Sequence, residues 1–218
     1  MPSDPDDDLK GSETRLWQLI AQRRRAGSGP EADAIDTRIW DLFGETWTIM
    51  FTDLSGFSRH VARFGIIHFL KIIHEQKEIL LPVVAAHDGI LIKIEADSFL
   101  ILFKRPERAL ACAVAMQHTC QRVNHDRAPE DMVLLCLGLG YGRILRIGDS
   151  DVFGSEVNAA SKLGEDIAGA NDILVTEAVR ELLCGPGTGH TAVEFTPLDG
   201  TVPGSSIAYR FRYDHAQG

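Results

Sequence analysis

Two acidic residues stand where a strand ends or turns, in positions suited to holding a cation. Asp53 closes the apolar stretch TWTIMFTD, and Gly56 then allows a sharp turn into a helix. Asp97 lies with Ala96 in a short turn between the two strands that we predict in ILIKIEADSFLILF. A pair of carboxylates suits Mg²⁺, which takes one or two protein carboxylates and completes its shell with water and substrate phosphates. Taken singly, each residue also has an ordinary interpretation, Asp53 as a helix cap and Asp97 as a turn residue.

The elements around these residues predict that the two carboxylates meet. From residue 46 the order strand, helix, strand, strand, helix, strand predicts an α+β fold with a ferredoxin-like βαββαβ core and an antiparallel sheet. The first strand of that topology lies beside the third, which brings Asp53 and Asp97 to one edge. Gly56 lets the chain turn with its backbone amides exposed at the head of the following helix, where they would favour a phosphate.

The remaining segments are expected to form one larger domain with an N-terminal appendage. Residues 1–12 are acidic and are expected to be disordered. Residues 13–45 predict a helical segment, and residues 46–218 form the domain itself. Within it we expect one long helical region over 58–89, a strand pair in MVLLCLGLGYGRILRIG, a helix in EVNAASKLGEDIAG and a final strand in GSSIAYRFRYD.

Composition excludes several classes of function. The chain has 22 Lys plus Arg against 31 Asp plus Glu, a formal net charge of -9, which argues against binding of nucleic acid or of an anionic membrane. No apolar stretch approaches the length of a membrane span and the acidic start lacks signal-peptide character, so we expect a cytoplasmic protein. The four cysteines show no CxxC or Cys/His pattern, and we expect reduced, mostly buried thiols.

Four stretches taken together resemble the catalytic domain of class III adenylate and guanylate cyclases. They are FTDLSGFS, IKIEADSFLILF, LGLGYGRI and DVFGSEVNAASKLGEDIA, and the resemblance runs from about Trp47 to Phe211. It implies that residues 46–218 are a nucleotide cyclase domain that acts in intracellular signalling. The implied enzyme is an adenylate cyclase that converts ATP to cyclic AMP and pyrophosphate at the interface of a homodimer.

The resemblance also implies roles for single residues. The metal site would comprise Asp53, Leu54 and Asp97, with two divalent ions, Mg²⁺ or Mn²⁺, that activate the ribose 3′-hydroxyl and neutralise the triphosphate. Residues that bind or act on the substrate would be Lys93 and Asp151 at the purine, Gly56 and Phe57 at the phosphates, Asn158 at the ribose, and Lys162 and Arg143 at the phosphate charge. A lysine can donate to an acceptor nitrogen of adenine, and an aspartate can accept from its exocyclic amine, so this pair favours ATP.

Three residues depart from the family pattern and keep alternatives open. Lys162 stands where arginine is usual. This predicts reduced turnover, because lysine lacks the planar guanidinium group that makes two hydrogen bonds to one phosphate. Asp199 aligns with a lysine that contacts the triphosphate. The turn EAD stands where a small IGD turn is usual, and Glu95 would either crowd the base pocket or point to the other strand face. The alternatives are a weak or inactive cyclase-like module that binds nucleotide and dimerises, and a cyclase that uses GTP or a pyrimidine nucleotide. The N-terminal helices either orient subunits, dock a regulatory partner or cap the domain's own flank.

Overall fold

The core of the chain folds in the expected order of strand, helix, strand, strand, helix, strand. The computed structural model describes residues 11–184, 194–200, 204–205 and 207–214, with residues 57–60 described by their backbone alone. In chain order the elements are α1 (Ser12–Ala26), α2 (Pro30–Phe43), β1 (Gly44–Leu54), α3 (Phe57–Phe64), α4 (Ile66–Ala86), β2 (Ile90–Glu95), β3 (Ser98–Phe103), α5 (Pro106–Asn124), η2 (Pro129–Asp131), β4 (Leu135–Ile147), β5 (Asp151–Phe153), α6 (Ser155–Ser161), η3 (Lys162–Ile167), β6 (Ile173–Thr176), α7 (Glu177–Cys184), β7 (Glu194–Pro197) and β8 (Ala208–Arg212).

The strands form one sheet whose topology matches the prediction. The strand order is β2-β3-β1-β4-β6-β8-β7, and β5 pairs with the end of β4. β1 runs antiparallel to both β3 and β4, so the first strand of the domain lies beside the third. Among the described strands only the β4–β6 pair is parallel. The expected α+β architecture with a mostly antiparallel sheet is therefore confirmed.

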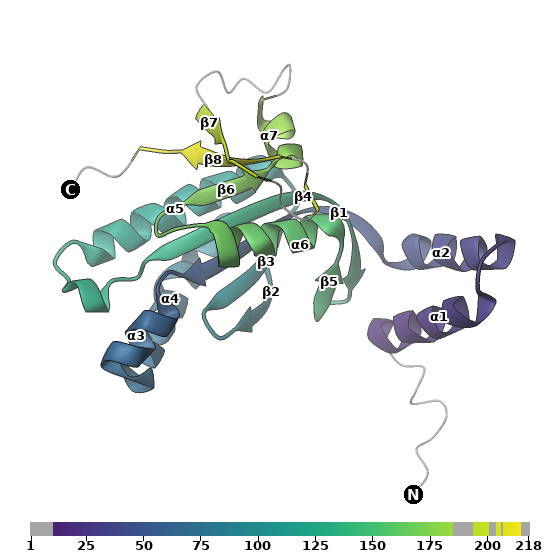
Figure 1. Cartoon of the computed structure of the whole chain (residues 1–218), viewed down its shortest axis with the longest axis horizontal. Coiled ribbons are helices and arrows are strands. Elements are labelled where there is room, and N and C mark those ends of the chain that lie inside the picture. Colours follow the sequence, from purple (N-terminus) through teal and green to yellow (C-terminus); the bar gives the residue numbers. More distant parts are fainter. Residues whose placement is uncertain (1–10, 185–193, 201–203, 206, 215–218) are drawn as a thin grey trace, which may run out of the picture.

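Helices cover the two faces of the sheet unequally (Figure 1). Helices α4, α5 and α7 pack on one face, where Phe69, Leu80 and Met116 belong to the largest group of buried apolar side chains. Helix α6 packs on the other face beside Trp47 and Ile49. Because residues alternate between faces along a strand, β1 contributes to both cores. The second face is less covered, and it carries the candidate site.

Two local predictions were wrong, and a third missed a change of helix type. The helical region over 58–89 is interrupted at Gly65, whose φ of 84° is accessible mainly to glycine, and so forms α3 and α4. The predicted strand pair in residues 132–148 is one long strand, β4, and its hairpin partner β5 comes after it. The predicted helix after residue 155 ends at Ser161 and continues as the π-helical turn η3. Strand β7 was not predicted.

The two N-terminal helices pack against the domain. Leu16 and Leu19 of α1 and Ile39 of α2 are buried together with Ile147, the last residue of β4. Figure 1 shows the pair beside the start of β1, where α2 leads directly into that strand. Helix α1 begins at Ser12, one residue before the expected boundary, and most of the tail expected to be disordered lies outside the described residues.

Two further expectations can be compared with the structure. All four cysteines are free thiols; Cys184 is exposed and the other three are buried, which confirms the expectation of unpaired, mostly buried cysteines. In the described part of the chain, no helix is both long and apolar enough to cross a membrane.

Candidate active site

Asp53 and Asp97 lie together at the edge of the sheet. Asp53 is the penultimate residue of β1, and Asp97 follows Ala96 in the turn between β2 and β3. Ala96 adopts a left-handed φ of 52°, as two-residue hairpin turns require. Ser98 Oγ, in the residue after Asp97, donates a hydrogen bond to Asp53 Oδ1 over 3.3 Å. The Gln76 side chain donates to the Asp97 carbonyl oxygen over 2.9 Å and fixes the turn from α4.

The neighbouring carboxylate of Asp97 destabilises the charged form of Asp53. Burial, together with the neighbouring charge of Asp97, raises the pKa of Asp53 from 3.8 to about 7, although hydrogen bonds from Ser98 and the Leu54 backbone oppose the rise. Glu165 of η3 adds a smaller repulsion. Asp97 is 8% exposed, and within the described residues its Oδ2 atom has no hydrogen-bond partner.

A divalent cation fits this acidic pair. The two carboxylates lie close together, and one oxygen of Asp97 is buried and unpaired. No positively charged group is among the described residues that act on Asp53. Across the described residues, no group of three or more His, Cys, Asp or Glu side chains is placed to hold a metal. The pair matches the sparse ligation that Mg²⁺ accepts when a phosphate substrate completes its shell.

The acidic pair predicts how metal-free stability depends on pH. Between about pH 4 and pH 7 folded Asp53 keeps a proton that the unfolded chain has lost, so the free energy of unfolding falls as pH rises through that window. Asp53→Asn cannot ionise. We expect it to exceed the parent protein in stability at pH 8 by at most about 4 kcal/mol, and to match it near pH 4. Thermal unfolding in metal-free buffer measures this difference.

Added Mg²⁺ provides the control for that prediction. Mg²⁺ should raise the melting temperature of the parent protein at pH 8 and leave that of Asp53→Asn unchanged, because the amide is a poor ligand for a hard cation. If Asp53→Asn were less stable than the parent protein at pH 8 without metal, the mutual repulsion assigned to the acidic pair would be wrong.

The turn after Asp53 presents a helix N-terminus. Gly56 takes a left-handed conformation (φ 89°, ψ 14°) and precedes Phe57, the first residue of α3. The first backbone N–H groups of a helix lack partners within the helix and favour anions. The predicted phosphate-binding turn therefore has the expected backbone form, while the side chain of Phe57 lies outside the described residues.

Lys93 and Asp151 form an ion pair on the less covered face of the sheet. Lys93 Nζ lies 3.1 Å from Asp151 Oδ2 and 3.0 Å from Glu95 Oε1. Burial lowers the pKa of Lys93, but hydrogen bonds and charges from Glu95 and Asp151 outweigh it, so the pKa is raised overall. An ammonium group has three N–H donors. Two point at carboxylates, which leaves one for a ligand.

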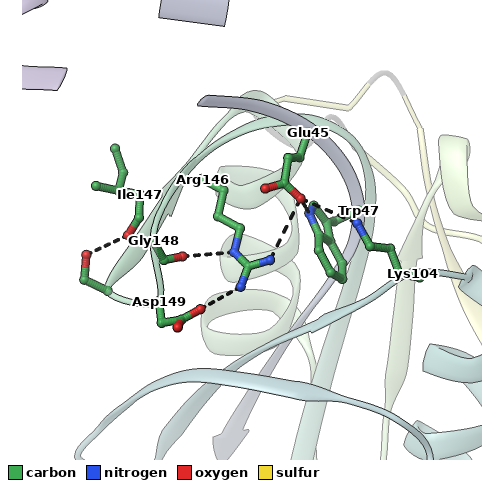
Figure 2. Close-up of polar contacts among 8 residues, drawn as sticks. Glu45, Trp47, Lys104, Arg146, Ile147, Gly148 and Asp149 are labelled. Atoms are coloured by element: carbon green, nitrogen blue, oxygen red, sulfur yellow. Dashed lines mark hydrogen bonds and ion pairs between the residues drawn. The ribbon is translucent and has the colours of Figure 1, made fainter. Parts of the chain in front are cut away.

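A polar cluster braces the hairpin that carries Asp151 (Figure 2). Arg146 donates to the Gly148 carbonyl oxygen over 2.9 Å and to Asp149 Oδ1 over 2.7 Å, closing the β4–β5 turn. Trp47 donates its indole N–H to Glu45 over 2.7 Å, and Arg146 Nη1 lies 3.9 Å from the same carboxylate oxygen. These contacts tie the hairpin to the start of β1 and limit the positions that Asp151 can occupy.

Asn158 and Lys162 share one side of the α6–η3 segment. Asn158 is exposed, and its side chain has no hydrogen-bond partner among the described residues. Lys162 Nζ lies 2.5 Å from Asp166 Oδ2, an ion pair within η3. Single π-helical turns inside helices occur frequently at functional sites. The amide of Asn158 is therefore free to meet a ligand, whereas the ammonium of Lys162 must first leave its carboxylate.

Arg143 lies away from the acidic pair of its own chain. The guanidinium of Arg143 stacks on the Trp40 ring of α2, 4.4 Å from its centroid. Arg143 pairs with Thr46 in the β1–β4 register, seven residues before Asp53 on β1, so the structure does not bring Arg143 to the acidic pair of its own chain. Asp199 is exposed in the turn after β7.

Sequence reasoning missed several residues that shape the site. Ser98 and Gln76 hold the acidic pair, Glu165 adds charge to it, and Trp40 engages Arg143. The position of Ser98 directly after Asp97 was a usable signal. Because Ser98 begins a strand next to Asp97, it must lie near Asp53 if Asp97 does. Gln76 and Trp40 offered none, since their contacts depend on tertiary packing.

The chain matches a known family over most of its length. Residues 43–211 match the family model described as adenylate and guanylate cyclase catalytic domain. This chain belongs to that family. The match covers the acidic pair, the Lys93–Asp151 pair and the α6–η3 segment of the cyclase domain. Cyclases of this family generally use divalent metal ions, act on a nucleotide and usually dimerise.

Curated relatives match the cyclase domain over a minor part of their own length. A Rhizobium meliloti (strain 1021) protein provisionally named adenylate cyclase 3 is 29% identical over 137 residues, which is 63% of this chain and 23% of that protein. The serine/threonine-protein kinase pkn2 of Myxococcus xanthus is 30% identical over 132 residues, 61% of this chain and 16% of that protein. The chain thus corresponds to less than a quarter of either relative.

Solved structures share the fold of the cyclase domain. An adenylate/guanylate cyclase/hydrolase from Silicibacter pomeroyi has a TM-score of 0.66 at 23% identity, covering 78% of this chain and 98% of that one. The adenylyl cyclase CyaB from P. aeruginosa has a TM-score of 0.64 at 17% identity, covering 79% and 96%. The guanylate cyclase domain of RhGC from Catenaria anguillulae, solved with GTP, has a TM-score of 0.62 at 16% identity, covering 77% and 96%. Adenylyl and guanylyl cyclases both occur among them, so the fold leaves the base open.

Proposed function

We propose that this cyclase domain is an adenylate cyclase, which converts ATP to 3′,5′-cyclic AMP and pyrophosphate. In this reaction the ribose 3′-oxygen bonds to the α-phosphorus, the bond from that phosphorus to pyrophosphate breaks, and the hydroxyl proton passes to solvent. The observation that carries the choice of base is the Lys93–Asp151 ion pair, joined by Glu95.

The hydrogen-bonding capacity of this pair matches adenine. The third N–H of Lys93 suits the ring nitrogen N1 of adenine, which is an acceptor, whereas N1 of guanine carries a proton. Asp151 Oδ1 accepts the Val152 backbone N–H over 2.8 Å, and Oδ2 accepts Lys93. Each carboxylate oxygen accepts a second hydrogen bond, so Asp151 also suits the exocyclic amine of adenine.

The acidic pair supports a metal-assisted reaction. Asp53 and Asp97, with Leu54 beside them, would hold Mg²⁺ or Mn²⁺, two ions per site. A divalent ion bound there would supply charge neutralisation for the triphosphate and would favour ionisation of the 3′-hydroxyl. The N-terminus of α3 after Gly56 would bind phosphate oxygens, Asn158 would orient the ribose, and Lys162 would offset charge at the α-phosphate after releasing Asp166.

We propose that two copies of the chain complete each site. One copy would supply Asp53 and Asp97, and the other would supply the base-reading pair together with Asn158 and Lys162. Phe153 and Ile167, which flank α6–η3, are 44% and 42% exposed in the single chain and are suited to burial by a second copy. Arg143 has no role in this arrangement while it stacks on Trp40.

A second candidate function follows from the ion pair of Lys162 with Asp166. If that pair persists with nucleotide bound, the site lacks the cation that offsets phosphate charge. The domain would then bind nucleotide and dimerise with little turnover. The exposed carboxylate of Asp199, where the family has a lysine, favours the same outcome.

The test is product formation by the purified protein from ATP, GTP, CTP and UTP, each with Mg²⁺ and with Mn²⁺. Cyclic AMP as the main product, absent from an Asp53→Ala preparation, is the expected result. Cyclic GMP or a cyclic pyrimidine nucleotide as the main product would overturn the assignment of the base. A folded protein that binds ATP and forms no cyclic nucleotide would favour the second candidate.

A further inference from the structure

Helix α6 is joined to the sheet by a side chain that the cyclase chemistry does not use. Glu156 lies two residues before Asn158, and its Oε2 atom accepts two hydrogen bonds from different strands. The Tyr141 backbone N–H of β4 donates over 3.0 Å, and the Thr176 hydroxyl at the end of β6 donates over 2.7 Å. One carboxyl oxygen thus links three elements.

The glycines of LGLGYGRI make room for this link. A Cβ atom on Gly140 would lie 2.5 Å from the Glu156 carbonyl oxygen, and one on Gly142 would lie 2.8 Å from Glu156 Cγ. Both distances are too short for real atoms. Any other residue at 140 would push α6 away from β4, and any other residue at 142 would displace the Glu156 side chain. The glycine pattern is therefore explained by the close approach of α6 to the sheet rather than by contact with nucleotide.

The same segment then continues to the groups proposed to act on the substrate. A Cβ atom on Gly138 would lie 2.2 Å from the Ala160 carbonyl oxygen, so the close contact extends along α6 to η3. The Asn158 backbone N–H donates to the Gly154 carbonyl oxygen over 3.2 Å, which places Asn158 within the first turn of α6. A shift at Glu156 would therefore move Asn158 and, through the following turn, Lys162.

We propose that Glu156 is a positioning residue, which holds α6 against β4 and β6 so that Asn158 and Lys162 keep their places. The catalytic part of this inference rests on the proposed cyclase function, while the tethering part does not. Burial raises the pKa of Glu156, and the hydrogen bonds from Thr176 and Tyr141 oppose the rise, as expected for a carboxyl group taken from water to serve as a shared acceptor. A Gln side chain can supply the same acceptor oxygen, whereas Ala cannot.

Kinetics of Glu156→Ala and Glu156→Gln test the catalytic part. We expect Glu156→Ala to lower kcat about 10²-fold with KM for ATP nearly unchanged, because misplacing a group that acts in the transition state costs on this order. Glu156→Gln should keep most of the activity. In a background that lacks both positioned groups, Asn158→Ala with Lys162→Ala, Glu156→Ala should cause little further loss, since their contributions are already removed. A Glu156→Gln variant as impaired as Glu156→Ala, or a full further loss from Glu156→Ala in that background, would overturn the proposal.

Amide hydrogen exchange tests the tether without any assay of activity. Glu156→Ala should speed exchange of the amides in residues 155–167 and leave those of β1 unchanged. Thr176→Val removes one of the two donors at nearly constant volume and should speed exchange in the same residues to a smaller extent. This variant still tests the tether if Glu156→Ala fails to fold. If the parent protein forms no cyclic nucleotide, the proposed function fails and exchange alone decides the tether. Unchanged exchange in both variants would overturn it.

Discussion

Asp53→Ala and Asp97→Ala are each expected to lower cyclic nucleotide formation on the order of 10³-fold or more, in Mg²⁺ and in Mn²⁺. The physical reason is that Asp53 and Asp97 form the acidic pair to which the divalent ions are assigned, and a single remaining carboxylate would hold them poorly. The measurement is the initial rate of product formation at saturating ATP.

Folding must be shown to survive for these losses to be informative. Asp97 is almost fully buried with an unpaired oxygen, so its removal takes away a buried polar atom that has no partner among the described residues and should not lower stability. Asp41→Asn is a matched control, because Asp41 is exposed on α2 and its change removes one carboxylate elsewhere. If the initial rate of Asp53→Ala were within tenfold of that of Asp41→Asn, the acidic pair would not be the metal site.

The double variant K93E/D151C is expected to invert the preference for the base. The introduced carboxylate suits the N1–H and amine of guanine, and the thiol is a weak partner for its carbonyl oxygen, so the ratio of kcat/KM for ATP to that for GTP should fall about 10²-fold or more. Competition assays with both nucleotides in one reaction measure this ratio directly.

The structure predicts that the single variant K93E behaves worse than the double variant. Lys93 lies between Glu95 and Asp151, at 3.0 and 3.1 Å. Replacing it alone would place three carboxylates together, whereas D151C removes one of them. We therefore expect K93E alone to lose activity with both nucleotides. An ATP preference that persisted in K93E/D151C would show that Lys93 and Asp151 do not read the base.

Much of the fold was predictable because its signals are local. The apolar stretch TWTIMFTD, the two-residue turn at Ala96 and Asp97 and the apolar period of α5 each specify an element without reference to distant residues. The break at Gly65 was missed because a single glycine inside a helical pattern is often tolerated. Strand β4 was divided in error because its glycines resemble a turn, whereas they accommodate α6.

The candidate site was predictable only in part, because side-chain partners are not local signals. The βαββαβ order was sufficient to place Asp53 near Asp97, and the structure agrees. Nothing in the sequence showed that Lys162 pairs with Asp166 or that Arg143 stacks on Trp40, since side-chain partners depend on rotamers and packing. The raised pKa of Asp53 likewise results from burial that a sequence pattern does not report.

Complementation between two inactive variants tests the composite site most directly. Asp53→Ala and Asn158→Ala, each inactive alone, would be mixed and allowed to exchange subunits before ATP is added. Half of the dimers would then be mixed, and each would carry one intact site. If each site is composite, the mixture should recover about a quarter of the parent activity. If the mixture stayed inactive although mixed dimers were demonstrated, Asp53 and Asn158 would not come from different copies, and the proposed site would be wrong.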